Sequence, residues 1–175
     1  MRRWSVLNGV VMCALVAGIV ALPAPARAWQ AFAKVTTSTG TIDGDAIDKG
    51  FERQITVLGL GNRIDRPLDA TGAPTGAIKA GPLQMVKRFD VATPKLVTAA
   101  AVGSVLSKVE ITIFKTTATG TSVPGFKITL TNALITQIDT TYDPGSDPST
   151  LEKIELAYQN FKWTDLITGA TGSAP

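Results

Sequence analysis

The side chains that could carry chemistry in this chain are carboxylates, lysines, tyrosines and hydroxyls. The 175-residue sequence contains no histidine, and its one cysteine is Cys13, close to the N-terminus. Ser-His-Asp and Cys-His catalysis, and zinc or haem ligation by either residue type, are therefore excluded from the rest of the chain. A pair of carboxylates could still act as acid and base, but spacing alone does not bring two acids together. We expect no catalytic residue, no metal site and no cofactor.

Two acidic stretches could suggest a cation-binding loop. They are Asp43-Gly44-Asp45 and the segment from Asp143 to Asp147. Neither has the twelve-residue calcium pattern with its terminal glutamate, and aspartate and glycine are common turn formers. We interpret both stretches as turns.

The first 28 residues have the three parts of a secretory leader. Arg2 and Arg3 precede an apolar run that ends at Leu22, and Ala-Arg-Ala28 matches a cleavage site. We predict a signal peptide over residues 1–28 with cleavage after Ala28, and hence an exported protein that is periplasmic or secreted. An uncleaved membrane anchor is the alternative, but a spanning helix needs ~20 apolar residues without an early proline.

Removal of this leader changes the charge of the protein. The full chain has 17 Lys and Arg against 14 Asp and Glu, and three of the arginines but no acid lie in residues 1–28. The remaining chain is formally neutral, so the basic pI of the whole sequence gives no support for nucleic-acid or anionic-membrane binding. Without a cysteine, its core or its oligomerisation must hold it together.

Residues 29–168 have the alternating pattern of half-buried β-strands and are expected to form one domain. Threonine and other polar residues alternate with branched aliphatic or aromatic residues, in particular over 51–57, 109–113, 126–138 and 154–163. The phase of the alternation changes across Asn160, which favours a β-bulge where the sheet bends. The predicted class is mostly β, an antiparallel β-barrel of two packed sheets.

One short flanking α-helix is predicted at about residues 94–102. Thr93 can cap its N-terminus, Pro94 fits the first helical position, and Gly103 is placed for a left-handed C-terminal turn. The helix carries no catalytic side chain, so its expected role is to cover the barrel. The face that we expect to pack on the barrel is formed by Leu96, Val97, Ala100 and Ala101.

Two segments lack a strand or helix period. Residues 63–81 are rich in glycine and proline, yet they contain Leu68 and Ile78, apolar side chains that a purely flexible linker would not need. We predict an extended loop that docks on something outside its own barrel, with disorder as the alternative. Residues 169–175 are mostly small and are predicted to form a flexible tail.

A pattern around the predicted helix carries a family resemblance. It reads Lys-x-x-Asp-x-x-Thr-Pro-x-Leu, and its members are Lys87, Asp90, Thr93, Pro94 and Leu96, followed by Gly103. A strand at 109–113, a hairpin through 126–138, a polar loop and a last strand region at 151–163 come next. This order resembles the Hcp family, the tube proteins of type VI secretion. The resemblance covers about residues 30–165.

The resemblance implies a β-barrel with one flanking helix, six copies closing into a ring, and rings stacking into a hollow tube. In the family a contractile sheath ejects this tube beneath a spike, and small effectors can travel in its lumen. The implied partners are further copies of this chain, together with spike, sheath or effector proteins. The extended loop of the family reaches the adjacent ring, which suggests a role in ring stacking for residues 63–81, with Leu68 and Ile78.

One feature departs from the family. Members that work inside the contractile apparatus assemble in the cytoplasm and usually lack a cleavable leader, whereas this chain has one; we favour export over a start codon downstream of Met1. The alternative function is a monomeric exported β-sandwich that binds a small ligand or peptide. It would need an aromatic-lined pocket, but the aromatic residues are scattered along the predicted strands.

Overall fold

The computed structural model describes residues 30–146 and 150–174. In chain order the first half contains β1 (Ala31–Thr37), β2 (Gly40–Ile42), β3 (Ile55–Gly61), β4 (Ile64–Asp65), β5 (Lys79–Ala80), β6 (Leu83–Lys87) and α1 (Thr93–Ala101). The second half contains β7 (Leu106–Thr116), β8 (Ser122–Tyr142), β9 (Thr150–Ala157), β10 (Asn160–Asp165) and β11 (Thr171–Ala174). No helix in the described ranges is long and apolar enough to cross a membrane.

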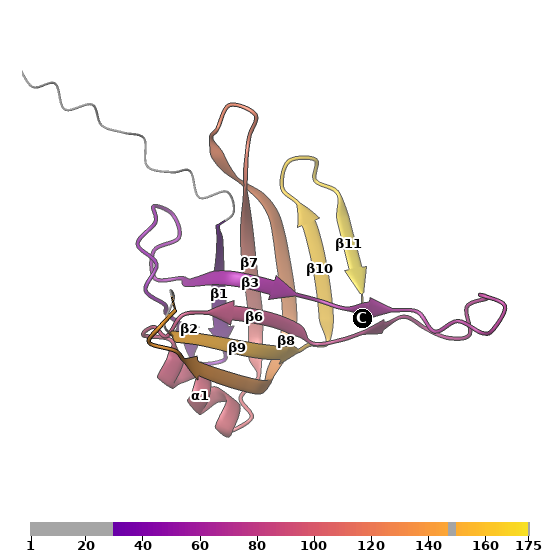
Figure 1. Ribbon diagram of the computed structural model, residues 1–175, viewed down its shortest axis with the longest axis horizontal. Helices are drawn as coiled ribbons and strands as arrows, with labels where there is room; N and C mark the ends of the chain where they lie inside the picture. Colours follow the sequence, from indigo (N-terminus) through magenta and orange to yellow (C-terminus); the bar gives the residue numbers. More distant parts are fainter. Residues whose placement is uncertain (1–29, 147–149, 175) are drawn as a thin grey trace, which may run out of the picture.

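Six strands close into an antiparallel barrel (Figure 1). β1 pairs with β3 and β7, β3 with β6, β6 with β9, and β9 with β8, which returns to β7. In Figure 1 β1, β7, β8 and β10 run side by side, and β3, β6 and β9 cross in front of them as a second layer. This arrangement confirms the predicted antiparallel barrel of two packed sheets, and its closure leaves the six strands without a free edge.

The barrel interior is filled by one side of each alternating strand. On β6, Leu83 and Met85 are buried, while Gln84 between them is partly exposed. Ile111 on β7 and Ile128 on β8 face each other in register, and both are buried in the same core. Burial of these side chains supplies the main favourable free energy of folding, as expected for threonine-alternating strands.

β8 is 21 residues long because it belongs to both layers. Its first part pairs with β10 over residues 126–131, and its second part pairs with β9 over 134–142. Asn132 lies at the junction with a φ of 49°, a left-handed conformation that asparagine tolerates better than most residues. The phase change that the sequence predicted as a bulge at Asn160 is instead a break between β9 and β10, where the chain passes from one layer to the other.

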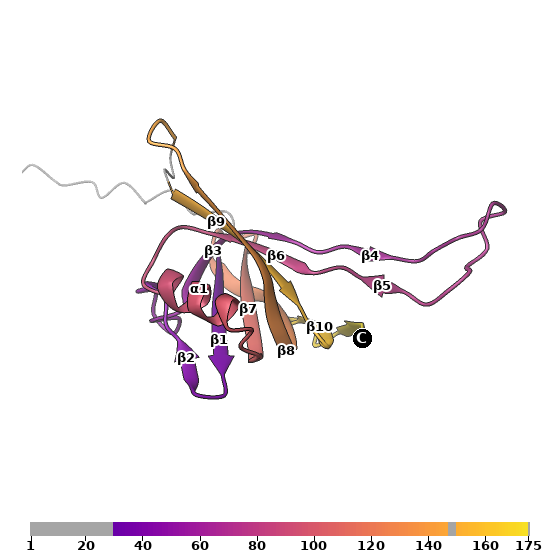
Figure 2. The same cartoon turned by 90° about the horizontal axis from the view of Figure 1, so that it is seen from below.

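The helix α1 lies at one end of the barrel (Figures 1 and 2) and differs from its sequence prediction in two respects. Thr93 does not cap it, because Ala92 occupies the N-cap position and no side chain caps the helix. The face on the core contains Leu96, Ala99 and the partly buried Ala100, so the prediction was right for Leu96 and Ala100 and wrong for Val97 and Ala101, which are exposed.

The C-terminal end of α1 is as the sequence predicts. Gly103 has a φ of 65°, a left-handed conformation that glycine adopts without steric cost. Its N–H donates to the carbonyl oxygen of Ala100, and the Ser104 N–H donates to that of Ala99. This pair of hydrogen bonds is the Schellman arrangement that ends many helices.

The segment between β3 and β6 is a long ribbon that projects away from the barrel (Figures 1 and 2). Residues 63–81 were predicted to lack strand structure, but β4 and β5 pair through Ile64 with Ala80 and Asp65 with Lys79. A further bridge joins Leu68 to Pro74 near the tip. We call residues 63–81 the projecting hairpin.

The C-terminal segment is also more ordered than predicted. Residues 171–174 form β11, which pairs with β10 through four residue pairs and extends the sheet beyond the closed barrel. Backbone hydrogen bonding needs no large side chain, so a run of small residues can form a strand when a neighbour offers a free edge. The predicted flexible tail over 169–175 is therefore wrong for these four residues. The predicted leader, with Ala28, lies outside the described residues.

Candidate functional site

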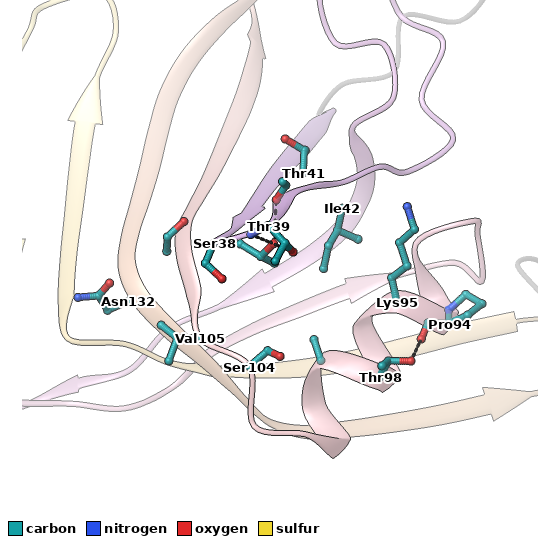
Figure 3. Close-up of a pocket in the computed structure, with 14 residues that line it drawn as sticks. Ser38, Thr39, Thr41, Ile42, Pro94, Lys95, Thr98, Ser104, Val105 and Asn132 are labelled. Carbon is teal, nitrogen blue, oxygen red and sulfur yellow. Dashed lines mark hydrogen bonds between the residues drawn. The ribbon is translucent and has the colours of Figure 1, made fainter.

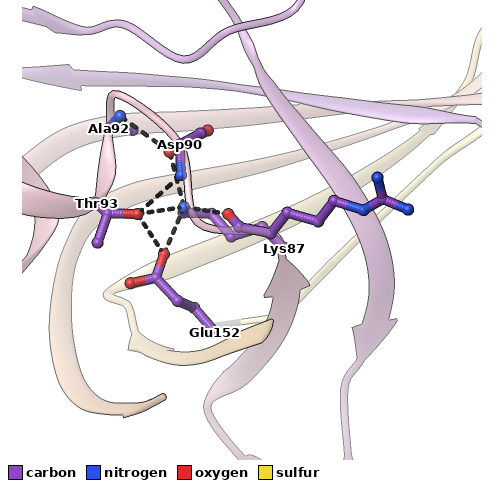
Figure 4. A network of polar contacts seen from close by, with 6 residues as sticks. Lys87, Asp90, Ala92, Thr93 and Glu152 are labelled. Atoms are coloured by element: carbon purple, nitrogen blue, oxygen red, sulfur yellow. Dashed lines mark hydrogen bonds and ion pairs between the residues drawn. The ribbon is translucent and has the colours of Figure 1, made fainter. Parts of the chain in front are cut away.

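A cluster of charged side chains is buried between β6, α1 and β9 (Figure 4). The Lys87 side chain has no solvent exposure, and its Nζ lies 2.8 Å from Asp90 Oδ1 and 2.5 Å from Glu152 Oε2. Nζ also donates to the carbonyl oxygen of Arg88 at 2.7 Å and lies 3.0 Å from Thr93 Oγ1. The Thr93 hydroxyl donates to Glu152 Oε2 at 2.7 Å. We call Lys87, Asp90, Thr93 and Glu152 the buried lysine cluster.

The strand register brings the two ends of this cluster together. Lys87 has the inward phase of Met85 on β6, and Glu152 has the inward phase of Ile154 on β9. Lys87 and Glu152 are also direct partners in the antiparallel pairing of these strands. Glu152 was not among the residues predicted from the sequence, although its inward phase on β9 could have identified it. A charged residue at an inward position of an apolar strand face needs a buried partner of opposite charge.

The rest of the cluster fixes the start of α1. Asp90 Oδ1 accepts hydrogen bonds from Lys87 and from the backbone N–H of Ala92, at 2.8 and 2.9 Å. The Thr93 hydroxyl accepts the backbone N–H of Asp90 at 3.1 Å while it donates to Glu152. Thr93 therefore connects the first residue of the helix to β9 rather than capping the helix.

The cluster is arranged for anchoring rather than for reaction. The Lys87 and Glu152 side chains are at most 1% exposed, so no substrate can reach them. No buried side-chain nitrogen or oxygen of the described residues lacks a hydrogen-bond partner. The structure thus brings together three of the predicted signature residues, while Pro94 is the exposed second residue of the helix, Leu96 packs in the core and Gly103 follows the end of the helix.

A groove of about 820 Å³ lies between the β1–β2 hairpin and α1 (Figure 3). Lys95 is the one charged residue among the described residues that line it. Some of its hydroxyls already donate to backbone carbonyls, Thr37 to Gly40 and Thr98 to Pro94, both at 2.9 Å. Within the described ranges, no carboxylate or imidazole lines the groove to activate a hydroxyl as a nucleophile. Its hydroxyl-bearing lining residues are Thr37, Ser38, Thr39, Thr41, Thr98, Ser104 and Ser107.

The projecting hairpin carries apolar side chains that its own barrel does not cover. Leu68 is 59% exposed and Ile78 is 40% exposed. Its tip is nevertheless structured, because Asp69 Oδ1 accepts the backbone N–H groups of Thr71 and Ala73 at 2.9 Å each. The Thr71 hydroxyl and these backbone groups lower the pKa of Asp69, so the carboxylate stays ionised.

The base of the projecting hairpin is fixed to the barrel. Tyr158, in the link between β9 and β10, donates its phenol to the carbonyl oxygen of Gly81 at 3.0 Å. Partial burial raises the pKa of Tyr158 above 10.0, against a smaller lowering by Asn62, so the phenol keeps its proton at neutral pH. An ordered ribbon with a fixed base and exposed apolar side chains is suited to contact another molecule.

Comparison with known proteins places this architecture in a known group. A family model described as "Type VI secretion system effector, Hcp" matches residues 32–164. The "Major exported protein" of Pseudomonas aeruginosa is 34% identical over 136 residues, which cover 74% of this chain and 79% of that protein. The range of the family model includes α1 and, apart from Ala31, all residues of the six barrel strands.

Solved structures show the same fold. The secreted protein Hcp3 from Pseudomonas aeruginosa is 26% identical, with a TM-score of 0.69 over 84% of this chain and 97% of that chain. The Hcp1 protein from E. coli EAEC 042 has a TM-score of 0.75 at 24% identity, over 83% of this chain and 97% of that chain. The barrel with its flanking helix is therefore shared by these proteins.

Proposed function

Because the chain belongs to the Hcp family, we infer that it is a structural subunit of a type VI secretion tube. Subunits of this family form rings of six that stack into a hollow tube, and the protein is a secreted one. The observation that carries this function is the family match over residues 32–164, which spans every strand of the closed barrel.

We propose that the chain has no catalytic activity and requires no cofactor. The family is one of structural tube proteins rather than enzymes. The described part of the chain supports the proposal, because the buried lysine cluster is sealed and the groove beside α1 has no general base.

We propose that the projecting hairpin governs ring stacking. The closed barrel needs no contribution from it, yet the hairpin is ordered and holds Leu68 and Ile78 in solvent. Apolar side chains on a pre-ordered projection gain free energy when a partner surface covers them. The adjacent ring is the partner that fits a tube, since each ring presents the same surfaces to the next.

We propose that residues 1–28 direct export and are removed after Ala28. The support is the sequence itself: a basic start, an apolar run and an Ala-x-Ala site. N-terminal sequencing of the exported protein should then begin at Trp29.

Spike, sheath and effector proteins of a type VI apparatus are the proposed partners besides further copies of the chain.

A monomeric binding module is less well supported. The groove beside α1 has no aromatic residue among the described residues that line it. Phe32, Phe51 and Phe114 instead pack against one another, with ring centroids 5.0 to 5.8 Å apart. A ligand pocket usually relies on such side chains for its affinity.

Light scattering combined with negative-stain imaging tests the tube function. We expect a molar mass of about six subunits and ring-shaped particles, because a heterologous contact that closes gives a defined ring. A sharp monomer at micromolar concentration, with no rings in the images, would contradict the proposed function and favour the binding module.

A further inference from the structure

The outward face of the sheet formed by β1, β7, β8 and β10 is rich in lysine and threonine. These strands lie side by side in Figure 1, and their pairing places Lys34, Glu110, Thr129 and Lys162 in one row across the sheet. Neighbouring rows on the same face add further residues. We call the following set the basic sheet face: Lys34, Thr36, Lys108, Glu110, Lys127, Thr129, Thr131, Lys162 and Thr164.

The charges on this face do not balance one another. Glu110 is its one acid, and Glu110 Oε1 lies 3.1 Å from Lys108 Nζ and 3.2 Å from Lys127 Nζ. Lys34 and Lys162, at the two ends of the row, have no carboxylate partner within the described ranges. Four lysines and one shared carboxylate leave a formal net charge of +3 on the basic sheet face itself.

This charge is concentrated on the face rather than typical of the chain. Residues 29–175 contain 14 Lys and Arg and 14 Asp and Glu. Without the four lysines and the one glutamate of the basic sheet face, 10 basic and 13 acidic residues remain. The basic sheet face is therefore more positive than the rest of the chain, and it attracts a partner of opposite charge.

The spacing of the lysines indicates the size of that partner. Adjacent strands lie about 4.8 Å apart, so Lys34 on β1 and Lys162 on β10 are separated by about 14 Å across the sheet. Lys108 and Lys127 lie in the flanking rows on opposite sides of this line. A single small anion cannot reach all four ammonium groups, whereas several carboxylates on one polypeptide can.

The other side chains of the face favour an acidic polypeptide over a nucleic acid. The basic sheet face as defined contains no aromatic residue to stack a base, and Phe32, on the same side of β1, is buried and packs against the partly exposed rings of Phe51 and Phe114. The face also contains no arginine, the side chain best suited to bidentate phosphate contacts. Threonine hydroxyls can donate to carboxylates and accept from backbone amides.

We propose that the basic sheet face binds an acidic polypeptide, through Lys34, Lys108, Lys127 and Lys162 as the charged contacts. This surface is distinct from the projecting hairpin, so the inference goes beyond ring stacking. Binding must weaken as salt rises, since exposed charges are screened within about 10 Å at 0.1 M ionic strength.

The test is the binding of fluorescein-labelled poly-L-glutamate to the full chain, followed by fluorescence anisotropy at 50 mM and 300 mM NaCl. The test variant is Lys34→Gln/Lys162→Gln, which removes two exposed charges without touching the core. The matched control is Lys49→Gln/Lys95→Gln, two exposed lysines outside the face, with the same change in net charge. We expect about fivefold weaker binding for the test variant and less than twofold for the control.

Four outcomes would overturn the proposal. The first is no binding of poly-L-glutamate at 50 mM NaCl, and the second is an equal loss in both variants, which would reflect net charge alone. The third is tighter binding of a labelled thymidine 20-mer that weakens in the same variant, which would make the face a nucleic-acid site. The fourth is a lower oligomer mass for the test variant but not for the control, which would make the face a contact between subunits.

Discussion

At the residue scale, Lys87 occupies a position where a barrel strand would ordinarily carry an apolar side chain. Its ammonium group is compensated by Asp90 and Glu152, and its remaining protons reach Arg88 and Thr93 oxygens. A buried ion pair of this kind often adds little net stability, because desolvation offsets the attraction. Its value here is positional: it sets where α1 begins relative to β9.

We predict that Lys87→Met lowers the free energy of unfolding by about 3 to 5 kcal/mol, because it leaves two buried carboxylates without their cation. Urea unfolding followed by circular dichroism measures this change. Lys153→Met is the matched control, since Lys153 lies on the neighbouring strand, its ion pair with Glu155 is partly exposed, and its loss should change stability by less than about 1 kcal/mol. Equal midpoints for the two variants would show that the cluster does not hold the fold.

Glu110 gives a pH prediction with a definite sign. Burial alone would raise its pKa, but hydrogen bonds from Lys108 and Lys127 and their positive charge lower the pKa below 4.5. The folded pKa is thus below the unfolded one, so Glu110 contributes stability above about pH 4.5 that is lost as the pH falls through the folded value. Urea midpoints at pH 7 and pH 3 should differ less in Glu110→Gln than in the wild type. An unchanged difference would contradict this.

At the element scale, the face that α1 turns to the barrel is the feature to test. Ala99 is buried against the core, whereas Val97 is 45% exposed. Ala99→Trp should lower the free energy of unfolding by about 1 to 3 kcal/mol or more, because the ring must force helix and sheet apart. Val97→Trp, the control on the same helix, should be nearly neutral. The melting temperatures of both variants measure these effects. A lower melting temperature for Val97→Trp than for Ala99→Trp would support the helix face predicted from the sequence.

The regular strands were predictable from the sequence, and the reason is local. Alternation of threonine with branched aliphatics, as in Ile111 and Ile128, depends on one strand at a time. The strand character of the projecting hairpin was not visible, because its two-residue strands pair across a long ribbon without any apolar alternation. β11 was missed for a similar reason: its glycine and small residues form a strand only because β10 offers an edge.

Three of the four residues of the buried lysine cluster were predictable from the sequence. Lys87, Asp90 and Thr93 are close in sequence and were identified together, but their fourth partner, Glu152, is 59 residues from Thr93 along the chain. Glu152 comes within hydrogen-bonding distance of Thr93 only because the pairing of β6 with β9 places Glu152 beside Lys87. The role assigned to Thr93 was wrong for the same reason, since a local rule suggested a helix cap while a distant carboxylate takes its hydroxyl.

At the scale of the whole molecule, folding and contact surfaces are separated. The six strands of the closed barrel pair with one another, so none of them needs a strand from another subunit. The core, α1 and the buried lysine cluster are likewise formed by residues of one chain. The projecting hairpin and the β10–β11 extension add surface beyond this unit. Changes to these additions should therefore alter assembly without unfolding the barrel, which makes assembly accessible to mutation.

The projecting hairpin permits the sharpest test of stacking. Asp65 pairs with Lys79 in the β4–β5 ladder, so replacing residues 66–78 by Asn-Gly should close a two-residue turn at the base of the ribbon. The barrel and ring mass should stay intact, since shortening this surface loop changes closure entropy by only about 1 to 2 kcal/mol. Tubes should become shorter or disappear, because the contact that we propose for ring stacking is removed.

A second variant separates the length of the projecting hairpin from its chemistry. Leu68→Ser/Ile78→Ser keeps the full ribbon but removes the exposed apolar side chains, and we expect it to shorten tubes almost as much as the deletion. Particle length and ring diameter in negative-stain images, at equal protein concentration, measure both effects. Full-length tubes formed by the deletion variant would show that the projecting hairpin has no role in stacking. Loss of rings in the same variant would place the hairpin between subunits of one ring. Short tubes from the deletion with full-length tubes from the serine variant would instead assign stacking to the polar backbone of the ribbon.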